Sequence, residues 1–185
     1  MLRAVIKRVI GLFKREDDPI ILAAINENRG NLWEKIEEFR HQFESLETTV
    51  KHGDKNMDEQ FPTKHHFDDG LYTRELFIPK GSLVVSFIHK QNHPSFFMKG
   101  ELSILTDSGE IKRIKAPMQV NTKIGTQRVA YAHEDTVWTC VYRTDAKTRE
   151  EAEADVYTDD FRKLPKEILT NPLEVTEYTN ELWLE

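Results

Sequence analysis

The stretch GSLVVSFIHKQNHPSFFMKGELSIL, residues 81–105, decides the fold. Short runs of β-branched and aromatic residues alternate in it with turn-forming residues, a pattern that predicts β-strands. Gly81 begins the stretch, and Gly100 separates two of its runs. His89 and His93 stand four residues apart in the middle. The stretch therefore raises the question of whether the two histidines form a metal site inside a β-barrel or whether only the barrel is kept.

The strand pattern continues on both sides of this stretch. Further runs are LYTRELFIPKG (71–81), EIKRIKAPMQV (110–120), QRVAYAHE (127–134) and TVWTCVYRT (136–144). Six short runs at similar spacing predict an antiparallel sandwich or barrel. The segment LTDSGEIKRI (105–114) predicts a hairpin that turns at residues 107–109. The predicted fold class is therefore mainly β.

Composition limits the class of protein. The chain has 185 residues, of which 38% are hydrophobic and 31% charged, and this favours one globular domain with extensions. A net charge of −6 argues against a nucleic-acid-binding protein. The single cysteine, Cys140, cannot form an internal disulfide, which favours a reducing compartment. The sequence predicts neither a secretory signal peptide nor a membrane-spanning helix.

Residues 1–18 predict a basic amphipathic helix, because five basic residues and no acid come before Glu16. Its apolar residues fall on one arc of a helical projection and its basic residues on the other. Three interpretations stay open. The helix packs on its own domain, it docks on a partner protein, or residues 2–13 contact a membrane surface.

Residues 19–66 predict a long helix followed by a polar linker at 51–66. The apolar positions of the helix alternate in steps of four and three, as in a heptad seam. This seam either joins copies of the chain into a homo-oligomer or packs against the chain's own domain. Residues 146–185 predict an acidic helical extension that ends in an aromatic tip. The candidate interaction residues are Leu32, Ile36, Phe39, Phe43, Leu46 and Trp183.

Residues 70–144 resemble the cupin family of small jelly-roll barrels, and the predicted barrel spans 67–145. Gly81 and Gly100 match the glycines that bound the first cupin motif. Counted back from Gly100, His93 takes the place of the family's metal-binding glutamate, His89 matches the second histidine of its pair, and Phe87 replaces the first.

The second cupin motif is changed as well. In KIGTQR, Lys123 replaces the motif's proline, Gly125 is kept, and Arg128 stands where the last metal-binding histidine would be. The pattern also resembles that of small cupin-like proteins encoded by tailed bacteriophages. This resemblance implies an origin and a location in a virion or in host cytoplasm, but no activity.

The resemblance implies a possible divalent metal, Fe, Mn, Ni or Zn, at His89 and His93. A third ligand is needed for a catalytic site. His133 is the first candidate, and Glu101, Glu134 and Asp135 are the others. The alternative is that the two histidines only form hydrogen bonds at the rim of the barrel, in which case no cofactor is expected.

Arg128 argues against a metal, because a guanidinium repels a dication and keeps its proton. Arg128 and Glu101 are instead candidate ligand-binding residues, since a guanidinium in a barrel mouth can hold a carboxylate or phosphate. The alternative is a structural ion pair of Arg128 with Glu75, Glu101 or Glu134.

Three functions remain. The first is a non-enzymatic structural or protein-interaction module, either a virion component or a host-interaction factor. The second is a metal-dependent cupin enzyme with an altered ligand set at His89 and His93. The third is a barrel that binds an anionic small molecule through Arg128. The amphipathic first helix, the heptad seam, the aromatic C-terminal tip and the altered metal motif favour the first.

Overall fold

The computed structural model describes residues 29–44, 49–106, 110–170 and 178 of the chain. The helix predicted at residues 1–18 and the predicted contact residues Leu46 and Trp183 lie outside the described residues. So do the side chain of Phe43 and the hairpin turn at 107–109.

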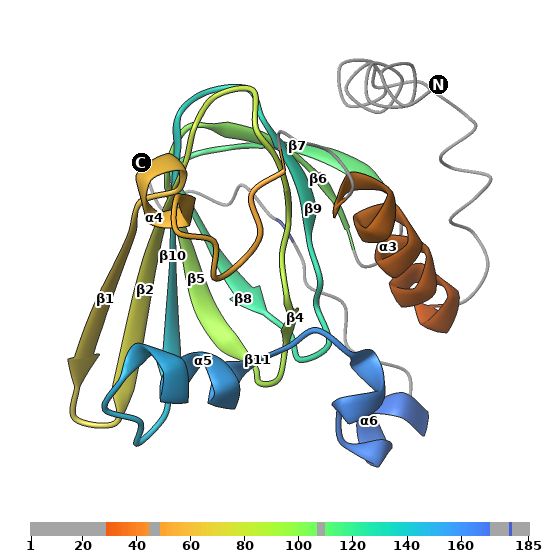
Figure 1. The fold of residues 1–185 in the computed structure, drawn as a ribbon, viewed down its shortest axis with the longest axis vertical. Coiled ribbons are helices and arrows are strands. Elements are labelled where there is room, and N and C mark those ends of the chain that lie inside the picture. Colours follow the sequence, from red (N-terminus) through yellow and green to blue (C-terminus); the bar gives the residue numbers. More distant parts are fainter. Residues whose placement is uncertain (1–28, 45–48, 107–109, 171–177, 179–185) are drawn as a thin grey trace, which may run out of the picture.

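The larger of the two main sheets has five antiparallel strands in the order β1-β2-β10-β5-β8 (Figure 1). Strand β10 lies in its centre and β1 at one edge. The bounds are β1 (Thr63–Asp68), β2 (Leu71–Ile78), β5 (His93–Lys99), β8 (Met118–Thr122) and β10 (Thr136–Arg143).

The second main sheet has four antiparallel strands in the order β3-β9-β6-β7, and a short pair joins β4 to β11. The chain is therefore mainly β with antiparallel pairing, as the sequence predicts. The predicted hairpin is confirmed as the β6–β7 pair. The bounds are β3 (Leu83–Val85), β4 (Ile88–His89), β6 (Glu101–Leu105), β7 (Ile111–Lys115), β9 (Val129–Ala132) and β11 (Tyr157–Thr158).

The core lies between the two main sheets, and the alternation of side chains along each strand builds it. In β10, every second side chain from Thr136 to Tyr142 is buried. These inward positions include Trp138, which stacks on Phe97 of β5 with ring centroids 5.3 Å apart, and Cys140. The opposite face of β10 points away from the core.

Helix α3 (Arg29–Glu44) covers the outer face of the four-stranded sheet (Figure 1). Leu32 and Ile36 are buried there against Val129 and Tyr131 of β9, and Phe39 packs at the same place. This corrects the view of Leu32, Ile36 and Phe39 as contacts for a partner. The apolar seam of the helix faces the chain's own sheet, so burial in the domain accounts for it.

Two short elements lie inside the stretch predicted as a linker. Helix α4 (Met57–Gln60) begins there, and β1 starts at Thr63. Strand β1 is at the edge of its sheet and is mostly exposed, so its sequence is polar. A polar edge strand lacks the apolar alternation by which strands are recognised, and this is why it reads as a linker.

The segment after β10 is helical in part, as predicted. Helix α5 (Arg149–Val156) begins with a capping box in which Thr148 and Glu151 bond to each other's backbone. It lies across one end of the five-stranded sheet (Figure 1). The 3₁₀ turn η1 (Phe161–Lys163) and helix α6 (Lys166–Thr170) follow β11. Across the described segments, no helix has both the length and the apolar character required to cross a membrane.

Gly100 makes the tight turn between β5 and β6, and its residue type is dictated by space. Its φ is +99°, a value that favours glycine. A Cβ at this position would lie 2.5 Å from Thr136 Oγ1 and 2.7 Å from the backbone oxygen of Asp135. The glycine that matches the end of the first cupin motif therefore lets β5 and β6 turn against the start of β10.

Candidate functional site

His89 and His93 lie side by side inside the barrel. His89 ends β4, His93 begins β5, and they are only 3% and 2% exposed. Their ring centroids are 4.7 Å apart. The ring of Tyr142, an inward residue of β10, packs on both, at 4.2 Å from His93 and 6.2 Å from His89. The structure thus brings together the two histidines that the sequence singles out.

The Arg128 guanidinium reaches into the same interior from the connection between β8 and β9. It is 8% exposed and makes a bond through each of its nitrogens. Nη1 donates to His89 Nε2 at 3.0 Å, Nη2 to Thr122 Oγ1 at 2.6 Å and Nε to the Tyr178 hydroxyl at 2.9 Å. A guanidinium only donates, so each of these three atoms must accept.

This fixes the position of the proton on His89. Burial, and after it the charge of Arg128, holds the pKa of His89 well below its usual range, so the ring is neutral. Because Nε2 accepts from Arg128, the ring proton is on Nδ1 and is donated to the Tyr142 hydroxyl at 3.2 Å. The Tyr142 and Tyr157 hydroxyls are hydrogen-bonded at 2.7 Å, and either of them can be the donor. The hydrogen-bond chain runs from Arg128 through His89 and Tyr142 to Tyr157.

His93 is also neutral but has a different environment. Its Nδ1 donates to the Gln91 backbone oxygen at 3.1 Å. Burial, with a smaller effect of Arg128, lowers the pKa of His93 to about 4. Its Nε2 is therefore an acceptor, and it is buried without a hydrogen-bond partner among the described residues. It is the one imidazole nitrogen of the pair that keeps a free lone pair.

His133 and Glu101 do not join this group, which corrects two of the predicted roles. Tyr131 faces α3 on the outside of the four-stranded sheet. His133 is two residues further along the chain and therefore lies on the same face, so its side chain points away from the barrel interior. His133 Nε2 is 2.8 Å from Ser103 Oγ. Glu101 also lies on that outer side.

Two of the three carboxylates predicted as partners of Arg128 are bonded elsewhere. Glu101 accepts from Arg113 Nε at 2.6 Å, and Glu75 accepts from Lys64 Nζ at 2.7 Å. The contacts of Arg128 described above are instead with an imidazole and two hydroxyls. The guanidinium is a fixed member of the interior, and each of its nitrogens already has an acceptor in the chain.

The donor set does not fit the metal that the cupin resemblance implies. Within residues 29–44, 49–106, 110–170 and 178, no group of three or more His, Cys, Asp or Glu side chains is placed to hold a metal ion. The metal-binding lone pair of His89 is taken by Arg128, and His93 alone is a single ligand. A guanidinium bonded at this place also repels a dication.

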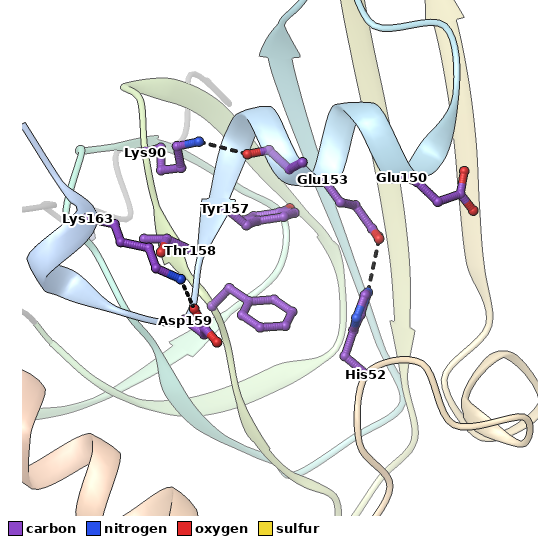
Figure 2. Close-up of a pocket in the computed structure, with 10 residues that line it drawn as sticks. His52, Lys90, Glu150, Glu153, Tyr157, Thr158, Asp159 and Lys163 are labelled. Carbon is purple, nitrogen blue, oxygen red and sulfur yellow. Dashed lines mark hydrogen bonds and ion pairs between the residues drawn. The ribbon is translucent and has the colours of Figure 1, made fainter.

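A groove of about 490 Å³ opens beneath α5, outside the barrel interior (Figure 2). The rings of Tyr157 and Phe87 form part of its wall, with centroids 6.0 Å apart. Lys90 lies toward one end of α5, and Glu150 toward the other. Tyr157 thus belongs both to the groove and to the interior hydrogen-bond chain, and burial raises its pKa to about 12, so its hydroxyl keeps the proton.

Sequence reasoning missed the hydroxyl groups of the interior. The alternation of TVWTCVYR places Tyr142 on the same face as Trp138 and Cys140, which is the signal that would have found it. Thr122 carries the same signal in β8, where alternate residues are buried. Tyr178 has no such signal, because it is far along the chain from any predicted strand.

Comparisons with known proteins give likenesses of structure. No family model and no curated protein matches the chain. It is similar to ectoine synthase from P. lautus, with 15% identity, 60% of this chain and 88% of that chain covered, and a TM-score of 0.44. It is also similar to the Cupin_2 domain of an XRE family transcriptional regulator from Enterobacter cloacae, with 15% identity, 47% and 99% covered, and a TM-score of 0.39.

A third similar structure is an RmlC-like cupin protein from Desulfovibrio desulfuricans, with 14% identity, 52% of this chain and 92% of that chain covered, and a TM-score of 0.38. Two of the three are described as cupins, the family that the sequence resembles. At these scores the likenesses carry no argument about activity, substrate or metal. The chemistry of this chain is therefore argued from its own residues.

Proposed function

We propose that the chain is a non-enzymatic cupin-like protein that acts as a structural or protein-interaction module. One observation carries the proposal, the bond of 3.0 Å from Arg128 Nη1 to His89 Nε2. The nitrogen that would ligate a metal in a cupin site is an acceptor for the chain's own guanidinium. The interior is used to hold the fold, which leaves the outer surface for function.

The outer face of the five-stranded sheet supports this proposal. Met98 is 58% exposed there, and Phe96, Phe77 and Val137 of neighbouring strands are partly exposed. Val137 pairs with Phe77 across β10 and β2, so the apolar side chains are adjacent. A sheet face that carries adjacent apolar residues at the surface is typical of a contact surface. We assign it to a second copy of the chain, through this sheet face rather than through the helical seam from which the sequence predicts a homo-oligomer.

Metal binding tests whether the bond from Arg128 to His89 excludes a metal. The wild-type protein is purified without tag or chelator, incubated with Fe, Mn, Ni or Zn, and its bound metal is measured. We expect less than one metal per ten chains. The Arg128→His variant, which removes the guanidinium and adds an imidazole, serves as the control and is expected to bind more. Stoichiometric metal in the wild type that disappears in His89→Ala would contradict the proposal and favour the metal-dependent enzyme.

Self-association tests the assigned surface. Sedimentation velocity of the full chain is compared with Met98→Glu and with Lys80→Glu, which changes an exposed residue on a turn after β2. We expect a dimer that Met98→Glu dissociates and Lys80→Glu does not. A monomer at all concentrations would remove the second copy as the partner.

The bacteriophage origin and the location in a virion or host cytoplasm stay predictions from the sequence resemblance. They are part of this proposal only as the setting in which a module without a metal site would act. Detection of the protein in purified virions of its source would test them.

A further inference from the structure

The groove beneath α5 contains two charged groups that the chain does not pair. Lys163 Nζ is 3.2 Å from Asp159 Oδ1, and Glu153 accepts from His52 at 3.0 Å. Lys90 and Glu150 also line the groove. In the described part of the chain neither Lys90 nor Glu150 has an ion pair. The groove therefore presents one cation and one anion that are not paired with an opposite charge among the described residues.

The two charges are separated along α5. Lys90 Nζ donates to the Ala154 backbone oxygen at 2.7 Å, so the ammonium lies near the end of the helix. Glu150 is four residues earlier, about 6 Å along the axis at 1.5 Å per residue. Figure 2 shows the two side chains toward opposite ends of α5, with Tyr157 between them. A ligand that meets both charges must therefore be elongated.

The wall between the two charges contains aromatic rings. Phe87 and Tyr157 face the groove, and His52 lies edge-on to Phe87 with centroids 5.1 Å apart. Aromatic rings between two charged groups suit an apolar side chain that is flanked by polar atoms.

We propose that this groove binds a short extended peptide with free ends, whose carboxylate meets Lys90 and whose ammonium meets Glu150. An extended chain advances about 3.3 Å per residue, so two to four residues span more than one helical turn. The side chain in the middle of the peptide packs on Phe87 and Tyr157. The site is distinct from the barrel interior and is independent of the proposed self-association.

The test uses the full chain and a matched set of tripeptides. Gly-Phe-Gly with free ends is compared with its N-acetyl form, its C-terminal amide and Gly-Gly-Gly, and binding is followed by chemical-shift changes in NMR spectra of the labelled protein. We expect each cap to weaken binding about fivefold, the size typical of one exposed ion pair. Loss of the phenyl group is expected to weaken it further.

Variants assign each end of the peptide to its residue. Lys90→Met should abolish the effect of the amide cap and keep that of the acetyl cap, whereas Glu150→Gln should do the reverse. Lys90→Arg, which keeps the charge, and Lys80→Met, outside the groove, should behave as the wild type. Each variant must give the spectrum of a folded protein, like that of the wild type, before its binding is compared.

The proposal would be overturned if no tripeptide shifts the spectrum at concentrations up to about 10 mM, on the order of the weakest affinities of interest. Equal binding of capped and uncapped peptides would also overturn it. So would cap effects that are unchanged in both Lys90→Met and Glu150→Gln. Shifts confined to residues far from α5 would also contradict it, since they would place the peptide elsewhere.

Discussion

Replacing Arg128 by methionine removes the guanidinium and keeps most of the aliphatic packing. The side chain is 8% exposed and lies with its guanidinium carbon 5.1 Å from the centre of the Trp138 ring. In the wild type it donates to His89, Thr122 and Tyr178. The variant leaves these acceptors inside the barrel without that donor. We expect it to fold, but with a much lower free energy of unfolding.

The magnitude follows from the bonds that are lost. A hydrogen bond to a charged group contributes about 1.5–3 kcal/mol to stability. Thr122 keeps a second bond, to Ser95 Oγ at 2.8 Å, so the free energy lost at Thr122 is at the lower end of this range. Relaxation around His89 and Tyr178 will recover part of the loss at the other two bonds. We therefore expect Arg128→Met to lower the free energy of unfolding by about 3–5 kcal/mol, a large share of the usual 5–15 kcal/mol.

Urea unfolding followed by far-UV circular dichroism measures this change. With a slope of about 2 kcal/mol per molar urea, the midpoint should fall by roughly 2 M. Arg143→Met is the matched control, because Arg143 is exposed on the outward side of β10. Its free energy of unfolding should change by less than about 0.5 kcal/mol.

The result that would refute the reasoning is a loss below about 1 kcal/mol, or a gain, in Arg128→Met. Charged groups held for a ligand commonly lower the stability of the free protein, so their removal stabilises it. A gain would therefore mean that the guanidinium is kept for an anion, and the small-ligand interpretation of the sequence would replace the structural one.

Three further changes test the rest of the fold. Gly100→Ala should destabilise the protein by at least about 2 kcal/mol more than Gly81→Ala in urea unfolding, because both have positive φ but only the first meets backbone within 3 Å. The pKa of His93 is lowered to about 4, so its stabilising effect is complete above pH 6.5 and is lost as the pH falls. The wild type should lose about 1 kcal/mol per pH unit more than His93→Gln between pH 6.5 and 5, and parallel curves would contradict this. Thr148→Ala should lower the free energy of unfolding by about 1 kcal/mol through loss of its bond to Glu151, and an unchanged thermal midpoint would show that the cap does not contribute.

The sequence predicts the sheets well because strand alternation is a local signal. The runs around His89 and in β10 are rich in β-branched and aromatic residues, and the hairpin turn is marked by small polar residues. The heptad seam of α3 is also local, but it shows only that one face of the helix is apolar. Whether Ile36 meets a second helix or the chain's own sheet depends on tertiary packing, which periodicity does not encode.

The site was predictable only in part for the same reason. The proximity of His89 and His93 is expected from the resemblance to the cupin motif, and their ring centroids are 4.7 Å apart. Their protonation, however, is decided by Arg128, which is distant along the chain, and by Tyr178, which no strand pattern predicts. His133 was wrongly predicted to face the barrel interior. It follows β9 directly, and a difference of one residue along a strand moves a side chain to the opposite face of the sheet.

The arginine at position 128 has a consequence for the proton on His89. Because Arg128 can only donate, it forces His89 Nε2 to accept, so the ring proton is on Nδ1 and is donated to Tyr142. A side chain at position 128 that can also accept would remove this constraint. The ring proton could then move to Nε2, and His89 would no longer be obliged to donate to Tyr142.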